Sequence, residues 1–386
     1  MKKLRILLTG GGTGGHIYPM IAVAEELKKQ SNKLGLFVDM RYFGGAYEYA
    51  QEIVDNGIEF IPVISSKLRR YFSPLNIIDG IKFVLSLFQL LWKIYWFMPD
   101  VVFSKGGPGA LAVVLISRFY FIPVVIHESD SIPGFTNEFS GKMAKKIFLA
   151  FSSAVDNFKN RDVEVVGNPV RESLFSQAES LIPAKEGDPV VQARKGFGLN
   201  PNEPVILILG GSQGSEVINN FILENLEDIV VDYQVLHQVG KRNFENYKKE
   251  YEFVNKEWTE AERNRYIYRP FFGTDISDAI IASDVVVARA GAGTIFELAA
   301  FGKPSILIPL PDAANDHQNE NARFYGNLGA AIVFKQENLL GQLFVKQLKL
   351  LMENKGLLKK MGESARIFYR PDSARIIAKY LLTYVG

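Results

Sequence analysis

The sequence predicts an α/β protein with two doubly wound, Rossmann-like domains in series. Short apolar runs alternate with helix-like patterns along the chain, which is typical of βα units and parallel sheets. A strand that enters a glycine-rich loop and then a helix occurs at residues 4–19 and again at 204–225. Because such sheets bind ligands at the carboxyl ends of their strands, we expect a site in a cleft between the two domains.

The composition indicates a globular protein of the cytosol. The chain has 386 residues, enough for two separate cores, and 47% are hydrophobic against 22% charged. A net charge of +2 gives no reason to expect a nucleic-acid partner. Cysteine is absent, which excludes disulfides, thiolate metal sites and cysteine nucleophiles. The first strand follows Met1-Lys2-Lys3 without the apolar core of a signal peptide, so we expect a cytoplasmic location.

The first domain, residues 1–168, contains apolar runs that end at glycine or at polar residues. Glycines follow the first, second and fourth runs, as expected where parallel strands open toward ligands. The predicted strands are 4–9, 36–42, 59–63, 101–104, 124–127, 146–150 and 163–166, and the predicted helices are 19–31, 46–56, 77–98, 109–119 and 135–144.

The second domain, residues 169–369, follows a turn at Gly167-Asn168-Pro169 and includes a stretch rich in proline, glycine and charge at 183–204. The final helix, 373–384, has no strand before it, so we expect residues 370–386 to pack back onto the first domain. The predicted strands here are 205–209, 233–239, 266–268, 285–288 and 305–308, and the clearest helices are 215–225, 293–301 and 318–327.

Residues 81–98 are an unusually apolar segment whose only charges are Lys82 and Lys93. The segment is near the lower length limit for a membrane-spanning helix, and both lysines count against spanning. Two other interpretations are a helix covered by the core and a helix that faces a membrane surface. A basic and aromatic cluster precedes it and would suit anionic lipid headgroups. The members of this cluster are Lys67, Arg69, Arg70, Tyr71 and Phe72.

The loop after the first strand reads GGGTGGH at residues 10–16 and has the chemistry of an anion site. Glycines allow a ligand to approach the backbone, and a helix N-terminus offers unpaired N–H donors. The loop also matches a dinucleotide fingerprint, and Asp39 could serve as its ribose acid, but Asp39 falls inside a predicted strand. No Gly-Lys-Ser/Thr follows either glycine loop, which excludes a P-loop. His16 is either a structural residue at the helix end or a general base.

The segment His127-Glu128-Ser129-Asp130 places a histidine and two acids at the end of a predicted strand. One interpretation is a helix cap beside a hydrogen-bonded histidine. The other is a group that binds a substrate hydroxyl or removes its proton. Neither this segment nor the polar residues around His317 have the spacing of a closed metal site, so we expect no metal.

Residues 289–297 again lead from a strand through a glycine turn into a helix. The small residues would let a diphosphate reach the helix N-terminus, where the helix dipole favours negative charge. Glu297, one turn further on, could accept hydrogen bonds from a ribose or form a capping box with Thr294. The polar stretch 312–321 opens the following helix, and its amides and carboxylates would suit sugar hydroxyls.

Five spaced motifs resemble glycosyltransferase family 28 of the GT-B superfamily, and within it the N-acetylglucosaminyltransferases of peptidoglycan synthesis. In chain order they are GGTGGHIYP, IHESDSIPGFTN, VGNPVR, ILGGSQGSEVIN, and ARAGAGTIFELAAFGKPSILIPLP followed by HQNENA. The resemblance implies inverting, metal-independent transfer of N-acetylglucosamine from UDP-N-acetylglucosamine to undecaprenyl-diphospho-muramoyl-pentapeptide (lipid I), which forms lipid II.

The same resemblance implies a peripheral enzyme at the cytoplasmic face of the cell membrane, with a part in cell-wall biogenesis, cell shape and cell division. It implies no cofactor besides the donor substrate. On the acceptor side it makes His16 the first choice for the general base, with Glu128 and Asp130 as alternatives. The loop residues that it places near the reacting sugar and the acceptor diphosphate are Thr13, Gly14 and Gly15.

On the donor side, the resemblance implies one group of residues around UDP-N-acetylglucosamine. Glycine-turn residues cradle the diphosphate, Glu297 binds the ribose, and Gln318 binds the sugar hydroxyls. Phe272 and Gly273 are expected near the uracil. The residues that it implies for the diphosphate cradle are Ala292, Gly293 and Thr294, and the further donor contacts are Arg171 and Ser212.

Two positions depart from the family pattern. Pro108 stands where a tyrosine is usual, and Asp130 stands where an asparagine is usual. An ionised aspartate can only accept hydrogen bonds, whereas an amide can also donate. Because both changes fall on the acceptor side, a relative that glycosylates another lipid, such as diacylglycerol, remains an alternative. A non-catalytic protein that binds a nucleotide sugar is a third hypothesis, and the sequence predicts no oligomeric state.

Overall fold

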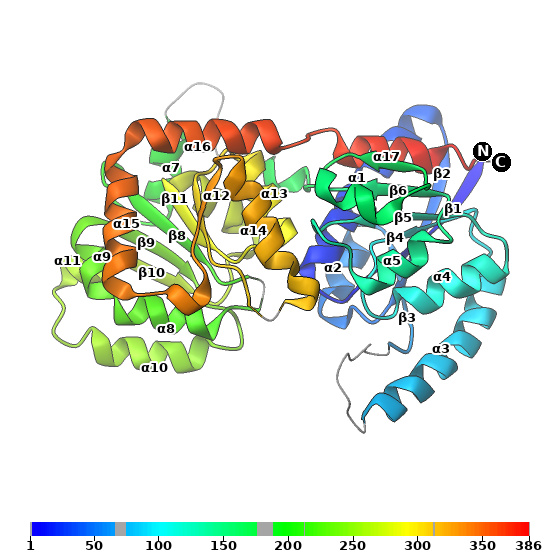
Figure 1. Ribbon diagram of the computed structural model, residues 1–386, viewed down its shortest axis with the longest axis horizontal. Coiled ribbons are helices and arrows are strands. Elements are labelled where there is room, and N and C mark those ends of the chain that lie inside the picture. Colours follow the sequence, from blue (N-terminus) through cyan, green and yellow to red (C-terminus); the bar gives the residue numbers. More distant parts are fainter. Residues whose placement is uncertain (1, 66–74, 176–187, 212, 312, 386) are drawn as a thin grey trace. The chain divides into compact units, whose positions relative to one another are not determined.

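The structure of the chain, a computed structural model, describes residues 2–65, 75–175, 188–211, 213–311 and 313–385. The chain divides into two compact units (Figure 1). The first unit comprises Met1–Arg171 and Arg370–Gly386, and the second comprises Glu172–Tyr369. We expected the domain boundary after residue 168, and the observed division falls after Arg171.

The first unit is built on a seven-stranded parallel sheet in the order β3-β2-β1-β4-β5-β6-β7. Strands β4 and β5 are buried at every residue, which explains why they read as continuous apolar runs rather than as alternating patterns. The bounds are β1 Lys3–Thr9, β2 Phe37–Gly44, β3 Glu59–Pro62, β4 Val101–Ser104, β5 Val124–Glu128, β6 Lys146–Leu149 and β7 Val163–Val165.

The winding direction of this sheet reverses between β1 and β4. The two strands are neighbours, with Ile6 beside Val101 and Thr9 beside Ser104. Loops that leave such a pair run to opposite faces of the sheet and open a crevice at its carboxyl edge, where ligands bind. The predicted glycine loop after β1 lies at this point.

Helix α1, Gly14–Leu34, begins five residues before the predicted start at residue 19, so that prediction was wrong. The Thr13 backbone is extended, and its carbonyl accepts the N–H groups of His16 at 3.0 Å and Ile17 at 3.1 Å. This first turn forms although Pro19 has no N–H to donate within the helix. Gly14 and Gly15 therefore belong to the first helical turn, and their own N–H groups are among those that a helix N-terminus leaves without intrahelical partners.

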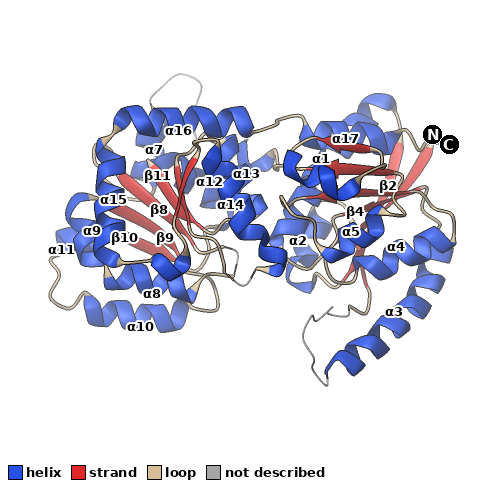
Figure 2. Cartoon of the chain, in the orientation of Figure 1, coloured by secondary structure: helices blue, strands red, loops and turns tan. Residues whose placement is uncertain are grey.

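Other helices of the first unit cover both faces of its sheet (Figure 2). The C-terminal α17, Ser373–Leu382, lies against α1 and buries Ile377 and Leu381 in the same core as Ile21. The predicted helix 46–56 is divided into a short 3₁₀ turn, η1 (Tyr47–Tyr49), and α2. The remaining elements are α2 Ala50–Asp55, α3 Leu75–Phe97, α4 Ala110–Phe119, α5 Phe135–Gly141 and η2 Ser152–Phe158.

Helix α3 contains the apolar segment 81–98 up to Phe97. One side of the helix packs into the core through Leu90, Ile94 and Phe97, so the core-helix interpretation applies to that side only. The opposite side, here called the α3 face, is exposed and consists of Ile77, Ile78, Ile81, Val84, Leu85, Phe88, Trp92, Tyr95 and Trp96.

Among the helices of the described ranges, none combines the length and the apolar character needed to cross a bilayer. The basic and aromatic cluster between Lys67 and Phe72 lies outside the described residues.

The second unit has a six-stranded parallel sheet in the order β10-β9-β8-β11-β12-β13. Its switch point lies between β8 and β11, where Leu209 pairs with Ala288. The short edge strand β13 was not among the predicted strands. The bounds are β8 Val205–Leu209, β9 Gln234–Gln238, β10 Tyr266–Arg269, β11 Val285–Ala288, β12 Ser305–Leu307 and β13 Ala331–Val333.

Helices also flank both faces of the second sheet (Figure 2). The three helices predicted most clearly here correspond to α8, α13 and α14. The helices are α7 Pro189–Gly196, α8 Glu216–Glu224, α9 Leu226–Asp232, α10 Phe244–Val254, α11 Glu260–Arg263, α12 Ile276–Ala282, α13 Ala292–Ala300, α14 His317–Asn327, α15 Gly341–Glu353 and α16 Lys355–Phe368. Short 3₁₀ turns are η3 Gly273–Asp275, η4 Ala314–Asp316 and η5 Gln336–Asn338.

Candidate functional site

The loops after β1 and β4 are in direct contact at the carboxyl edge of the first sheet. Gly107 has a φ of +83°, and a Cβ atom there would lie 2.9 Å from the Gly11 backbone and 3.2 Å from His16 Nε2. Only glycine fits both the backbone conformation and the space. The Tyr42 hydroxyl also donates to the Gly10 carbonyl at 2.9 Å, so the first loop is supported from β2 as well.

His16 lies in the first turn of α1 and is half-buried. Its Nδ1 is 3.0 Å from the Thr13 hydroxyl, and a hydrogen bond there would orient the ring. The structure therefore brings Thr13, Gly14, Gly15 and His16 together on one turn. At this edge, their backbone N–H donors could bind an anion, and the imidazole could accept a proton.

Glu128 ends β5 and is buried, with 4% of its surface exposed. Its carboxylate accepts the Asp130 N–H at 2.9 Å, the Gly134 N–H at 3.1 Å and the Asn137 Nδ2–H at 3.0 Å. Burial, together with the nearby charge of Asp130, raises the pKa of Glu128 to about 7. Because it is buried and accepts three hydrogen bonds, Glu128 is suited to hold the 130–134 loop in place. Asp130 is half-buried and is therefore more accessible to a substrate.

Arg171 belongs to the first unit, although we predicted it as a donor contact of the second domain. Its guanidinium lies 3.7 Å from the centre of the Tyr18 ring, and its Nη1 is paired with a Glu52 carboxylate oxygen at 3.1 Å. The Tyr18 ring in turn contacts Tyr49 edge-on. Arg171 is thus positioned by α2 and by α1, and α1 is also the helix that carries His16.

In the second unit, the loop after β8 leads into α8, and the loop after β11 leads into α13. Ser212, predicted to contact the donor, lies outside the described residues. The N-cap of α8 is Ser215, whose hydroxyl accepts the Ile218 N–H. Both loops follow the strands at the switch point, so the two helix N-termini face the carboxyl edge where anions are favoured.

Arg289, directly after β11, is a buried cation that connects these loops, and the sequence prediction did not include it. Its Nη2 donates to the Ser215 hydroxyl and to Gln336 Oε1, both at 2.7 Å. Its Nη1 donates to the Ile308 and Pro309 carbonyls, both at 3.1 Å. Because all four acceptors are uncharged, the positive charge is held at this edge by neutral oxygen atoms. A diphosphate would be the natural counter-charge.

Helix α13 carries the predicted diphosphate and ribose residues. Its N-cap is Gly291, so Thr294 is not a cap and the alternative that Glu297 completes a capping box was wrong. Gly293, Thr294 and Glu297 are half-buried along one side of the helix, whereas Ala292 is buried on the core side. The helical repeat therefore brings the three half-buried residues onto one face.

Gln318 and a second amide of α14 bind the neighbouring loops. Gln318 Oε1 accepts the Leu310 N–H at 3.0 Å, which leaves its NH₂ group as the part that can donate to a sugar hydroxyl. Asn321 is fully buried and donates to the Ala290 carbonyl at 3.2 Å. Asn321 was not predicted as a site residue, because its partner is 31 positions away in the sequence.

Phe272 and Gly273, expected near the uracil, are linked to the glycine loop by Gln238. The Gln238 amide donates to the Gly211 carbonyl at 3.2 Å and accepts the Phe272 N–H at 3.1 Å. Gly273 has a φ of +57° and begins η3. The end of β9 therefore joins the two segments, and Gln238 was a further residue that the prediction did not include.

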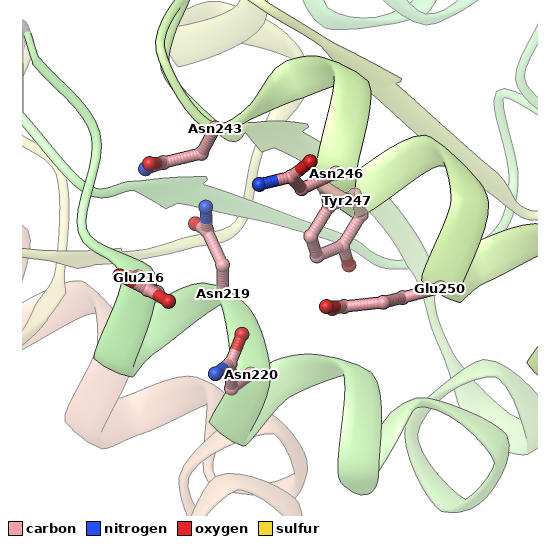
Figure 3. A pocket seen from close by; sticks show the side chains of 7 residues that line it. All are labelled: Glu216, Asn219, Asn220, Asn243, Asn246, Tyr247 and Glu250. Atoms are coloured by element: carbon pink, nitrogen blue, oxygen red, sulfur yellow. The ribbon is translucent and has the colours of Figure 1, made fainter.

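A polar pocket lies between α8 and α10, and Figure 3 shows side chains of both helices directed around it. None of the predicted site residues lines it. Asn219 and Tyr247, on opposite sides, are joined beneath it through the buried His237 and Tyr266, with distances of 3.2, 2.8 and 2.5 Å along the chain of contacts. The lining residues are Glu216, Asn219, Asn220, Asn243, Asn246, Tyr247 and Glu250.

Within the described ranges, no three histidine or carboxylate side chains are grouped closely enough to hold a metal ion. Asp39, the acid that a dinucleotide site would need, lies within β2 and is paired with Lys3 at 3.0 Å. Asp39 is therefore held in an ion pair and lies away from the strand end, where a ribose-binding acid would have to lie.

Comparison with protein families matches both halves of the chain. Residues 6–149 match the glycosyltransferase family 28 N-terminal domain, and residues 205–375 match the glycosyltransferase family 28 C-terminal domain.

Curated relatives extend the match to nearly the whole chain. A protein of Clostridium botulinum (strain Loch Maree / Type A3) is 34% identical over 98% of this chain and 99% of its own length. A protein of Legionella pneumophila (strain Lens) is 33% identical over 97% of this chain and 96% of its own length. Both are named UDP-N-acetylglucosamine--N-acetylmuramyl-(pentapeptide) pyrophosphoryl-undecaprenol N-acetylglucosamine transferase.

Solved structures agree with the fold. The chain is similar to MurG of Acinetobacter baumannii with a TM-score of 0.71 and 25% identity, over 98% of this chain and 99% of that one. UDP-GlcNAc 2-epimerase of Neisseria meningitidis, solved with UDP-GlcNAc bound, gives a TM-score of 0.68 at 16% identity, over 98% and 100% of the two chains. The second likeness concerns the fold alone.

Proposed function

Because this chain belongs to glycosyltransferase family 28, a family of enzymes with the predicted GT-B fold of two Rossmann-like units, we propose that it transfers N-acetylglucosamine from UDP-N-acetylglucosamine to the muramoyl-pentapeptide diphosphate of undecaprenol. The product would be the disaccharide lipid used for peptidoglycan. The names of the curated relatives state this donor sugar and this acceptor. They favour it over diacylglycerol, which the sequence alone left open.

The observation that carries the proposal most directly is the buried Arg289 between two helix N-termini of the second unit. UDP is the leaving group of the reaction, and negative charge develops on its β-phosphate as the bond to the sugar breaks. A fixed cation and preorganised N–H donors stabilise such charge without reorganisation. Glu297 on α13 and the NH₂ group of Gln318 are our choices for the ribose and the sugar hydroxyls.

In the inverting reaction, the acceptor hydroxyl attacks C1 of the sugar as the bond from C1 to the UDP oxygen breaks. The hydroxyl proton must leave during this step, and His16 is our first choice for the base. If Nδ1–H donates to the Thr13 hydroxyl, the neutral ring has its lone pair on Nε2, which is then the atom that would take the proton. Asp130 is the alternative base, and Glu128 is better suited to orient the segment that carries it.

We place the α3 face against the cytoplasmic side of the membrane, where a lipid-linked acceptor resides. The face is rich in tryptophan and tyrosine, and the side chains of Trp92 and Trp96 are 65% and 68% exposed. Aromatic residues of this kind concentrate at the membrane–water interface. Phe119 and Phe121 at the end of α4, the helix that packs on α3, are exposed as well. This arrangement supports peripheral attachment through one helix.

The decisive experiment is transfer of labelled N-acetylglucosamine by the full chain to defined acceptors in detergent. We expect a labelled lipid product with the muramoyl-pentapeptide diphosphate acceptor and stoichiometric UDP release. Diacylglycerol should give neither. Product with diacylglycerol alone would establish the other lipid acceptor, and UDP-N-acetylglucosamine binding without transfer to either would establish a binding protein.

A further inference from the structure

Lys105, the first residue after β4, is a buried lysine in the middle of the acceptor-side edge. Only 2% of its surface is exposed. Its Nζ lies 2.5 Å from His127 Nδ1, 2.6 Å from the Ser129 hydroxyl and 3.2 Å from Asn168 Oδ1. An ammonium group has three N–H donors, and the protein supplies three acceptors. The side chain is therefore completely satisfied in its charged form.

The partners of Lys105 are themselves fixed. Because His127 Nδ1 accepts from the lysine, its Nε2 carries the ring proton and donates to the Gly167 carbonyl at 2.9 Å. Burial, with the charge of Lys105 beside it, holds the pKa of His127 well below its usual value, so the ring is neutral. The Ser129 hydroxyl donates to Asn168 Oδ1 at 3.1 Å. Through these hydrogen bonds, the Lys105 ammonium links the carboxyl ends of β4, β5 and β7.

The network surrounds the two acids that we considered for catalysis. Ser129 stands between Glu128 and Asp130, and both carboxyls interact favourably with the Lys105 charge. Burial lowers the pKa of Lys105 to about 7, while the two acids act in the opposite direction. If the lysine were absent, a diphosphate would approach an edge that carries Asp130 and the partly ionised Glu128 without a compensating cation.

Two further titratable groups border the network. His16 is separated from Lys105 by Gly10, where a Cβ atom would lie 3.3 Å from Lys105 Cβ and 3.5 Å from His16 Cβ. Arg370 borders the network at Gly167, where a Cβ atom would lie 2.9 Å from Arg370 Cβ. The Ser373 hydroxyl of α17 also donates to the Gly167 carbonyl at 2.9 Å. Lys105 is the group that contacts His127 and Ser129 directly.

We propose that Lys105 is a positioning residue for the transfer reaction: its ammonium aligns residues 127–130 and offsets the charge of Glu128 and Asp130, so that a diphosphate-bearing acceptor can bind beside them. The inference rests on the proposed function of this edge. It assigns the lysine a role through its neighbours, since the side chain itself is shielded from any substrate.

The test is Lys105→Met in the full chain, which keeps an unbranched side chain one atom shorter than lysine and removes the charge. Initial rates of transfer to the muramoyl-pentapeptide diphosphate acceptor are measured from pH 5.5 to 9. We expect the KM for the acceptor to rise at least fivefold and the acid limb of kcat/KM to move up by about one pH unit, because removing a nearby cation raises the pKa of a base, whether it is an imidazole or a carboxylate. The KM for UDP-N-acetylglucosamine should stay within about twofold of the unmodified value if the lysine acts only on the acceptor side.

Lys303 provides the matched control. It is a half-buried lysine whose Nζ donates to the Ile281 and Ser283 carbonyls of the second unit at 3.0 and 2.6 Å. Burial lowers its pKa to about 8. Lys303→Met should reduce thermal stability and leave the pH profile where it is. An equal shift in both variants, or no shift in a folded Lys105→Met, would overturn the proposal.

Ser129→Ala keeps the test decisive if Lys105→Met does not fold. This variant removes one acceptor of the ammonium and retains the charge, so we expect kcat/KM for the acceptor to fall severalfold without a shift of the acid limb. Unchanged kcat/KM in a folded Ser129→Ala would reject the positioning role. Failure of the unmodified chain to glycosylate the muramoyl acceptor would instead reject the proposed function.

Discussion

The Nη2 atom of Arg289 donates to the Ser215 hydroxyl at 2.7 Å, which joins the end of β11 to the N-cap of α8 across 74 positions of sequence. Both segments leave the switch point of the second sheet, where the winding direction reverses. The contact places a buried cation between two helices whose N-termini attract anions. On the side that we propose for the donor, an arginine with no carboxylate among its four acceptors therefore connects the two loops.

Arg289→Met should weaken UDP-N-acetylglucosamine binding at least tenfold, equivalent to about 1.4 kcal/mol, because the fixed charge near the diphosphate is lost. Isothermal titration of the full chain with the donor measures this. Arg194→Met is the matched control, since Arg194 is equally buried but donates to the Ala282 carbonyl at 2.9 Å and to Asp284 at 2.7 Å. Comparable losses of affinity in both variants would contradict the role of Arg289.

Glu297→Ala and His16→Ala should separate donor binding from catalysis. We expect Glu297→Ala to raise the dissociation constant of UDP-N-acetylglucosamine at least tenfold, because a ribose hydroxyl loses its acceptor. His16→Ala should leave that constant within twofold and lower kcat by about 10²-fold or more, as expected for removal of a general base. Equal losses of donor affinity would contradict the division between the donor and acceptor sides.

Replacing Trp92 and Trp96 together by serine should release the chain from membranes. Burying an aromatic side chain in the interface is worth on the order of 1–2 kcal/mol, so two substitutions should reduce partitioning more than tenfold. Sedimentation with vesicles that contain anionic phospholipid measures it. Phe253→Ser, which removes a 72% exposed aromatic side chain from the second unit, is the control and should partition like the unmodified chain. Transfer to a water-soluble, short-chain acceptor should persist in both.

His237 makes the stability of the second unit depend on pH. Burial lowers the pKa of His237 to about 3, below its usual value of 6.5. Below pH 6.5 the unfolded chain takes up a proton that the folded unit excludes, so the unfolding free energy falls by about 1.4 kcal/mol for each further pH unit.

The variant His237→Gln removes this proton uptake and retains a group that can bond to Asn219 or Tyr266. Denaturant unfolding between pH 7 and pH 4 should show a shallower loss of stability for the variant. Its stability at pH 7 should be lower, because the glutamine cannot reproduce both contacts at 3.2 and 2.8 Å. Parallel pH curves for the two proteins would show that His237 is not the group responsible.

Much of the fold was predictable because its signals are local. Strands β4, β8 and β11 are apolar runs of four or five residues bounded by glycine, proline or charged residues, and they lie at their predicted positions. The glycine loops were recognised for the same reason. The start of α1 was mispredicted because Pro19 was read as the first helical residue, whereas the turn had already formed on the Thr13 carbonyl.

The sequence by itself determined the strand-loop-helix units, the places where ligands could approach the backbone, and the family resemblance. These features depend on residues that are neighbours along the chain. The tertiary structure decided which distant side chains meet. Lys105 contacts Ser129 and Asn168 at separations of 24 and 63 positions, and α3 buries one side while the α3 face stays exposed. Such pairings follow from strand order and packing, which place side chains together only once the whole sheet has formed.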